Sequence, residues 1–424
     1  MLLFVYHLAW TLFVIPLLPF LRLLRTHRLL RRLAFDLPGR GIEGKTIWIH
    51  ALSVGEVLSA LPLVESIRKR FPREPIAFTV TTRQGMEVAR RELQGEVQML
   101  LPMPLDFWWA MLRLIRHLQP KLFILVETDL WPGLTDHLAR RNIPAVLVNG
   151  RVSPRTLRSY RRFRFFIGKV LERFRVCLMQ TELDRARLLE TGIPAEKVKS
   201  LGNIKFDREH TPMSEKERRD WLRAFGLSEE DKVWLAGSTH AGEEKIIIDI
   251  FEQIRSSFPL LRLLIAPRRR ERAEEVQRLA EARGFTVVMR TAMPAGGPPS
   301  FDVLVLDTVG ELGRLYAIAC VSFVGGSLVP EGGHNLLEPA SFGCPVLFGP
   351  HTDDFKTMAE ALLEAGGGMR VHDAQQLSHA VLALLSNPAK RDRMGASARR
   401  FVEGNRGALE RVMNELVGLT DHPG

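Results

Sequence analysis

The sequence predicts an α/β protein built on two doubly wound parallel sheets. Short apolar runs alternate with longer helical stretches, and the alternation occurs in both halves of the 424-residue chain. The runs lack the polar alternation of half-exposed strands, so helices should cover both faces of each sheet. Two sheets fit the length, because single hydrophobic cores stop growing beyond about 250–300 residues.

The expected strands define the two halves. In the first half they are residues 47–51, 76–80, 99–101, 122–127, 145–149 and 176–180. In the second half they are residues 233–237, 261–266, 286–289, 303–306, 321–324 and 345–348. Ligands of such sheets bind beyond the carboxyl ends of the strands. We therefore expect the functional residues just after these runs, in a cleft between the two domains.

Changes in composition suggest four segments. Residues 1–32 form an apolar run with a basic flank, and residues 33–207 form the first Rossmann-like domain. The polar, charged stretch 208–218 opens the second Rossmann-like domain, which we expect to extend from 208 to 386. Residues 387–424 are charged and amphipathic and could cross back to the first domain.

The N-terminal run suggests a membrane anchor. Residues 1–21 carry no charged side chain, and a cluster of arginines follows them: Arg22, Arg25, Arg28, Arg31 and Arg32. An apolar run of this length can span a bilayer, although His7, Pro16 and Pro19 also allow an interfacial helix. The positive-inside rule places the arginines and the following domains on the cytoplasmic side. A cleaved secretory signal fits less well, because the charges follow the apolar run.

Other basic runs suggest anionic partners. The chain has a net charge of +11, with dense runs at residues 155–164 and 268–272. Anionic lipid or phosphate suits such runs. Nucleic acid is the weaker alternative, because the sequence contains no signature of an RNA-binding module.

The stretch from 322 to 350 is the richest in functional signals. After the expected strand 321–324 come two glycine pairs, Gly325-Gly326 and Gly332-Gly333, and then His334, Asn335, Leu336, Leu337 and Glu338. Glycine pairs let backbone N–H groups approach an anion, and the positive end of a following helix adds to the attraction. Glu338, expected about one turn inside that helix, could accept two ribose hydroxyls. The alternative is a tight turn with a polar cap.

Three further features of the second half suit an anionic ligand. Residues 237–240, with Glu243 and Glu244 behind them, again lead from a strand into a helix. Arg268 follows Pro267 at a strand end and could hold a phosphate bidentately. Val309, Gly310 and Glu311 cap the helix after the expected strand 303–306. The sequence contains no D-x-D, so we expect N–H dipoles, Arg and Lys to stabilise a monophosphate leaving group without a metal.

Carboxylates also follow two strands of the first half. Ser53 and Glu56 have the spacing of a capping box, which is the structural alternative for this motif. Glu56 also suits a general base, because the helix dipole would hold it ionised and Gly55 leaves space for a substrate. Glu127 and Asp129 precede Trp131, where the alternative is a strand-end cap.

A lysine completes this group of candidates. Lys205 belongs to the segment G-N-I-K-F-D, which we expect to end a strand just before the polar stretch between the two domains. A lysine at this place could reach charge that develops in the cleft, and a solvated linker lysine is the alternative.

Together these motifs resemble a known family. The chain resembles the 3-deoxy-D-manno-octulosonic acid (Kdo) transferases of Gram-negative lipopolysaccharide assembly along nearly its whole length. The matching motifs are I-W-I-H-A-L-S-V-G-E, E-T-D-L-W-P, N-G-R-V-S, G-N-I-K-F-D, A-G-S-T-H-x-G-E-E, A-P-R, V-G-E-L and F-V-G-G-S-L-V-x-x-G-G-H-N-L-L-E-P. Several long motifs in one order make the resemblance specific.

The resemblance implies a GT-B glycosyltransferase fold, two Rossmann-like domains facing a cleft. It implies CMP-Kdo as donor, a lipid A precursor (lipid IVA) as acceptor, and inverting transfer at the bacterial inner membrane without metal or cofactor. Glu56 would accept the proton, and Glu127 and Lys205 would stabilise the transition state. The residues implied to bind CMP are Pro267, Arg268, Val309, Gly310, Glu311, Asn335, Leu336, Leu337 and Glu338.

The chain departs from the family pattern at three positions. Arg269 stands where His is usual after P-R, Val309 replaces Met, and Asp129 replaces a second Glu. None of these changes removes a proposed catalytic group. Two rival functions stay open on sequence alone. One is a GT-B epimerase or UDP-sugar transferase, and the other is a non-catalytic membrane protein that binds lipid or nucleotide.

Overall fold

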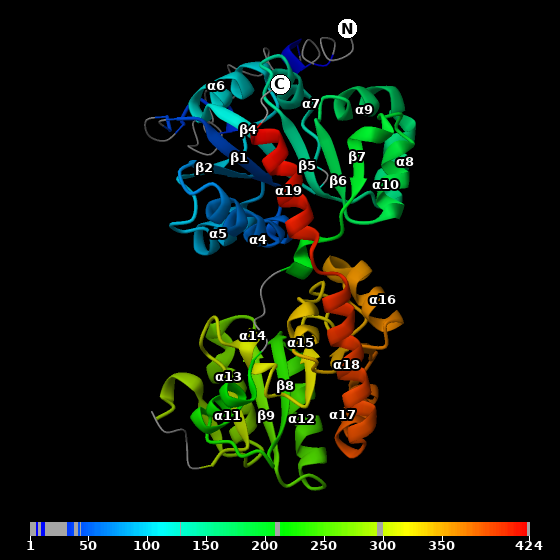
Figure 1. Ribbon diagram of the computed structural model, residues 1–424. Helices are drawn as coiled ribbons and strands as arrows, with labels where there is room; N and C mark the ends of the chain where they lie inside the picture. Colours follow the sequence, from blue (N-terminus) through cyan, green and yellow to red (C-terminus); the bar gives the residue numbers. More distant parts are fainter. Residues whose placement is uncertain are drawn as a thin grey trace. The chain divides into compact units, whose positions relative to one another are not determined.

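The computed structural model describes residues 6, 10–12, 32–37, 41–42, 44–127, 129–207, 213–294 and 300–421. The chain divides into two compact units (Figure 1). Unit 1 comprises Met1–Arg208 together with Asn405–Gly424, and unit 2 comprises Glu209–Gly404. Each unit contains its own parallel sheet of seven strands.

The sheet of unit 1 has the strand order β3-β2-β1-β4-β5-β6-β7. Its strands are β1 (Thr46–Ala51), β2 (Ile76–Val80), β3 (Met99–Pro102), β4 (Pro120–Val126), β5 (Ala145–Gly150), β6 (Val176–Met179) and β7 (Val198–Ser200). Strand β1 pairs with β2 on one side and with β4 on the other. The strand order reverses there, so the loops after β1 and β4 diverge and leave room for a ligand.

Helices cover both faces of this sheet. Ile47 and Ile49 of β1 pack on one face, and Trp48 packs on the other. The first face is covered by α4 (Val54–Arg70), α5 (Arg83–Glu92) and α19 (Ala408–Asp421). The second face is covered by α6 (Trp108–Leu118), α7 (Pro132–Ala139), α8 (Pro154–Arg162), α9 (Arg164–Leu171) and α10 (Glu182–Leu189).

Unit 2 repeats the plan with a different strand order, β10-β11-β9-β8-β12-β13-β14. The strands are β8 (Lys232–Thr239), β9 (Leu261–Pro267), β10 (Val287–Met289), β11 (Val303–Val305), β12 (Val321–Val324), β13 (Val346–Phe348) and β14 (Gly368–Arg370). Its helices are α11 (Glu215–Ala224), α12 (Glu243–Arg255), α13 (Ala273–Glu281), α14 (Leu312–Leu315), α15 (Leu337–Ser341), α16 (Lys356–Glu364), α17 (Ala374–Ser386) and α18 (Pro388–Gly404). Here the order reverses between β8 and β12.

The prediction of two buried parallel sheets is confirmed. Every expected apolar run contains a strand, and β7 and β14 lie outside those runs. Both are three-residue strands at sheet edges, and each includes a basic residue, so neither forms an apolar run. Within the described parts of the chain, no helix is long and apolar enough to cross a membrane. Most of the expected anchor, residues 1–5, 7–9 and 13–31, lies outside the described residues.

Helix α19 returns the chain to unit 1 after α18. The Asp207 carboxylate accepts hydrogen bonds from the backbone N–H groups of Gly407, at 2.5 Å, and Leu409, at 2.7 Å. Arg411 Nε donates to the carbonyl of Leu201 at 3.0 Å. Helix α19 is thereby fastened to the short 3₁₀ helix Ile204–Asp207, which carries Lys205.

We expect Asp207→Ala to lower the free energy of unfolding of unit 1 by about 1.5–3 kcal/mol, since hydrogen bonds to a charged acceptor contribute in that range. A urea titration of the purified protein measures the loss. Asp207→Asn keeps an acceptor oxygen, so its free energy of unfolding should fall by less than that of Asp207→Ala. Equal stability of Asp207→Ala and wild type would show that the two N–H groups find other partners.

Candidate active site

Glu56 lies at the start of α4, directly after β1, and is 8% exposed. Its Oε2 atom accepts a hydrogen bond from the backbone N–H of Leu52. The predicted capping box does not form, because the Ser53 side chain makes no capping hydrogen bond. A Cβ atom added at Gly55 would meet no atom within 4 Å, so the space beside Glu56 is open.

The charge state of Glu56 differs from the prediction. Burial, followed by the nearby negative charge of Glu127, raises the pKa of Glu56 to about 8. The hydrogen bond from Leu52 lowers this pKa, but it only partly offsets the effects of burial and of Glu127. The expectation that the helix dipole holds Glu56 ionised is therefore wrong near neutral pH. A carboxylate with a pKa close to the working pH is well suited to general-base catalysis.

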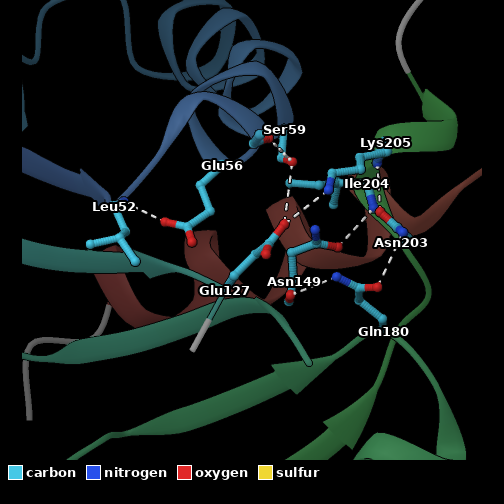
Figure 2. A network of polar contacts seen from close by, with 10 residues as sticks. Leu52, Glu56, Ser59, Glu127, Asn149, Gln180, Asn203, Ile204 and Lys205 are labelled. Atoms are coloured by element: carbon cyan, nitrogen blue, oxygen red, sulfur yellow. Dashed lines mark hydrogen bonds and ion pairs between the residues drawn. The ribbon is translucent and has the colours of Figure 1, made fainter. Parts of the chain in front are cut away.

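Glu127 follows β4, the neighbour of β1 in the sheet, so the two carboxylates meet where the strand order reverses. Its Oε1 atom lies 3.0 Å from Lys205 Nζ and accepts a longer hydrogen bond, 3.4 Å, from Ser59. Figure 2 shows Glu127 reaching towards Ser59 and Lys205, with Glu56 beside it. Glu127 has a φ of 62°, a costly conformation for a non-glycine residue that often marks functional sites.

A polar network holds the segment that carries Lys205. Asn149 Oδ1 accepts a hydrogen bond from Ile204 N at 3.2 Å, and Gln180 Nε2 donates to Asn149 O at 3.0 Å. Asn203 bridges Gln180 and the backbone N–H of Lys205 (Figure 2). Sequence reasoning assigned no role to Asn149 or Gln180. Their position was the available signal, because Asn149 lies at the carboxyl end of β5 and Gln180 directly follows β6.

A pocket of about 280 Å³ opens beside these side chains and is lined by Leu52, Glu56, Glu127, Asp129, Arg151, Ser153 and Thr156. Asp129 Oδ2 accepts a hydrogen bond from Trp131 Nε1 at 2.8 Å and lies 3.7 Å from His50 Nε2. Three carboxylates, a guanidinium and hydroxyl groups can bind a polar, hydroxyl-bearing ligand. Deprotonation of a bound hydroxyl is the chemistry that this arrangement favours.

In unit 2, Glu243 occupies the predicted anion cradles. Its buried carboxylate accepts hydrogen bonds from four backbone N–H groups at 2.7–3.0 Å: those of His240, Gly326, Ser327 and Leu328. The expectation that these N–H groups bind a ligand is therefore wrong. The carboxylate instead joins the loops after β8 and β12, the two strands at which this sheet reverses its order.

The second glycine pair leads to two stacked histidines. Gly332 and Gly333 adopt φ values of 85° and 77°, which favour glycine. His334 Nε2 lies 2.8 Å from His240 Nε2, and the rings stack with centroids 5.1 Å apart. Burial, then the charges of Arg268 and His240, lowers the pKa of His334 to about 3. His334 is therefore neutral at physiological pH.

The residues after His334 form a short capped turn. Asn335 Oδ1 accepts a hydrogen bond from Leu337 N at 3.1 Å, and Asn335 Nδ2 donates to Glu338 Oε1 at 3.2 Å. Glu338 is the second residue of the five-residue helix α15, so it lies nearer the loop than predicted. Leu336 and Leu337 are buried.

The remaining candidates of unit 2 lie on two loops. Pro267 ends β9, and the exposed Arg268 follows it. Val309 is 70% exposed and Gly310 has a φ of 96°. Although burial would raise the pKa of Glu311, hydrogen bonds from Arg290 and Thr308 hold it below its usual value. No group of three or more His, Cys, Asp or Glu within the described ranges is placed to hold a metal ion.

Comparisons with known proteins identify the family. A family model, 3-deoxy-D-manno-octulosonic-acid transferase, matches residues 27–208. The 3-deoxy-D-manno-octulosonic acid transferase of Haemophilus influenzae is 36% identical over 87% of this chain and 86% of its own length. The chain belongs to this Kdo transferase family. The Kdo transferase of Bordetella pertussis is 32% identical over 87% of this chain and 86% of its own length.

The predicted enzyme class, a glycosyltransferase, follows from membership of the Kdo transferase family. Its fold is also shared outside the family. UDP-GlcNAc 2-epimerase from Neisseria meningitidis superposes with a TM-score of 0.57 over 88% of this chain and 100% of that chain, at 15% identity. This likeness concerns the fold alone.

The raised pKa of Glu56 predicts a pH-dependent stability. The Glu56 carboxyl stays protonated up to about pH 8 in the folded Kdo transferase, whereas a glutamate in the unfolded chain ionises near pH 4.5. The stability contributed by the neutral form is therefore lost as pH rises from about 4.5 to 8. Glu56→Gln should gain stability relative to wild type across this window, as measured by thermal denaturation at each pH.

Glu65→Gln is the matched control, because Glu65 is exposed on the same helix. Its stability relative to wild type should change little with pH. A constant difference between Glu56→Gln and wild type from pH 5 to pH 8 would contradict the raised pKa.

Proposed function

We propose that this Kdo transferase moves Kdo from CMP-Kdo onto lipid IVA, a lipid A precursor, with inversion and without a metal ion. We place the reaction at the cytoplasmic face of the bacterial inner membrane, with the apolar N-terminal run as anchor. The observation that carries the proposal is Glu56, a carboxylate of pKa about 8 in an open polar pocket.

In the proposed reaction the pocket of unit 1 binds the acceptor sugar. Ionised Glu56 takes the proton from an acceptor hydroxyl, and the resulting oxygen attacks the anomeric carbon of Kdo. A carbon–oxygen bond forms while the bond from that carbon to the phosphate oxygen breaks, and CMP leaves with the electron pair. Attack from the face opposite to CMP inverts the configuration.

The ion pair of Glu127 and Lys205 would act on the charges of this transition state. The Glu127 carboxylate favours positive charge at the anomeric carbon, and the Lys205 ammonium favours negative charge on the leaving phosphate. Glu127 also strengthens the base, because its charge raises the pKa of Glu56. The network through Asn149, Gln180 and Asn203 fixes Lys205 in advance of the reaction.

CMP would bind unit 2 through three segments: Pro267–Arg268, Val309–Glu311 and Asn335–Glu338. Arg268 is exposed and supplies a guanidinium for the phosphate. Asn335 donates to Glu338 and so orients the carboxylate that would accept the ribose hydroxyls. The Glu311 side chain is paired with Arg290, so this segment would offer its backbone N–H groups to the nucleotide.

We expect Glu56→Gln to reduce turnover about 100- to 10,000-fold, the usual effect of losing a general base. The assay combines freshly generated CMP-Kdo with a tetraacylated lipid A precursor, and mass spectrometry follows the lipid product. CMP affinity should be unchanged, because unit 2 binds the nucleotide. Turnover near the wild-type rate would reduce Glu56 to a structural residue and make Glu127 the candidate base.

We expect Glu338→Ala to weaken CMP binding by about 1–3 kcal/mol, since buried hydroxyls of the ribose would lose their acceptor. Isothermal titration with CMP measures the change. Glu364→Ala, at an exposed position of α16, serves as the control. Unchanged CMP affinity would show that another residue contacts the ribose. Tighter binding of UDP than of CMP would favour the epimerase or UDP-sugar alternative.

A further inference from the structure

Helices α8 and α9 of unit 1 present an unusual outer surface. Helix α8 buries only Tyr160. Arg155, Arg158 and Arg162 are exposed, and their spacing of three and four residues places them on one face of the helix. Arg164 and two phenylalanines follow immediately. We call these six residues the α8–α9 surface: Arg155, Arg158, Arg162, Phe163, Arg164 and Phe165.

The phenylalanines of this surface are exposed to solvent. Phe163 is 54% exposed and Phe165 is 85% exposed, the highest exposure among the large hydrophobic residues that the structure describes. The Arg162 guanidinium lies 5.7 Å from the centre of the Phe163 ring. Exposed aromatic rings among positive charges are typical of segments that bind at a membrane interface.

The charge of the surface is also unbalanced. The sequence contains no Asp or Glu between Asp136 and Glu172. Two neighbouring cations have carboxylate partners, Arg161 with Glu190 at 2.6 Å and Lys169 with Glu172 at 2.9 Å. They are therefore not counted as part of the surface. The four arginines of the α8–α9 surface remain exposed, and each can attract an anionic headgroup.

Two observations connect the α8–α9 surface to the proposed site and to the N-terminal run. Thr156 of α8 and the N-cap residue Ser153 line the pocket that contains Glu56, so one nine-residue helix joins the pocket to the surface. The Phe166 ring lies next to Phe165 in sequence and contacts Tyr6, with centroids 5.8 Å apart. Tyr6, a residue of the apolar N-terminal run, therefore lies at the same part of unit 1.

We propose that the α8–α9 surface docks on an anionic lipid bilayer, with Phe163 and Phe165 inserted at the headgroup boundary and the arginines on lipid phosphates. The proposal rests on the proposed function in one respect, namely that the acceptor is a membrane lipid. A bilayer is favoured over nucleic acid because the sequence contains no signature of an RNA-binding module and the proposed acceptor is itself a membrane lipid. Docking through α8 would hold the Glu56 pocket close to the headgroup of the acceptor.

A fluorescent probe in the full chain tests the docking directly. Cys177 and Cys344 are buried, so Cys320→Ser removes the partly exposed thiol. In that background an environment-sensitive fluorophore is attached at Phe165→Cys or, as the control, at Arg90→Cys on α5. With vesicles of phosphatidylglycerol and phosphatidylethanolamine, the probe at 165 should shift to shorter wavelength and be quenched by spin-labelled lipid. The probe at 90 should do neither.

Charge reversal separates the surface from any N-terminal anchor. Arg158→Glu with Arg162→Glu should reduce the affinity for anionic vesicles, as reported by the probe at 165, about tenfold or more, because basic side chains near such a membrane are attracted to its anionic lipids. The control pair Arg90→Glu with Arg91→Glu keeps the response. Pure phosphatidylcholine vesicles should give a weak response.

Two results would overturn the proposal. One is a probe at 165 that stays water-like while the protein is bound to anionic vesicles. The other is a response to single-stranded RNA that vesicles do not produce. The probe readout does not depend on turnover, so failure of docking is distinguishable from failure of the proposed reaction. If the phenylalanines serve only to dock on the bilayer, Phe163→Ser with Phe165→Ser should retain turnover on acceptor dispersed in detergent.

Discussion

Burial of the Glu56 carboxyl, together with repulsion from Glu127, is the constraint on which the chemistry of unit 1 depends. Glu56 and Glu127 follow adjacent strands, and both cannot ionise at low energy unless a cation lies near. Lys205 supplies that cation to Glu127, and Glu56 keeps its proton up to about pH 8. Much of the surrounding structure, from Asn149 to α19, serves to hold Lys205 in place.

The sheets could be predicted from local patterns, and so could three of the side chains that the structure brings together in unit 1, those of Glu56, Glu127 and Lys205. Apolar runs marked the long strands. The rule that ligands bind at strand ends directed attention to Glu56 and Glu127. The short edge strands β7 and β14 carry no such pattern. The pKa of Glu56 was also beyond local reasoning, since it depends on burial and on Glu127 at the end of another strand.

Unit 2 shows a different limit of reasoning from motifs. The glycine-rich loops do cradle an anion, as their sequences indicate, but the anion is the chain's own Glu243. The packing of α12 against two loops determines which carboxylate reaches the four N–H groups. Spacing along the chain does not reveal this packing. The result is a hydrogen-bonded junction between the loops after β8 and β12, next to which His334, neutral at physiological pH, stacks on His240.

The return of α19 to unit 1 makes unit 2 an insertion within another domain. Asp207 and Gly407 are hydrogen-bonded, so the chain leaves unit 1 and re-enters it at one point. During synthesis the ribosome must therefore complete all of Glu209–Gly404 before the last piece of unit 1 emerges. At about 5–20 residues per second, translating these roughly 200 residues takes about 10–40 s. Through that interval the support that α19 gives to the segment of Lys205 is missing, so unit 2 is fully synthesised before unit 1 can be completed.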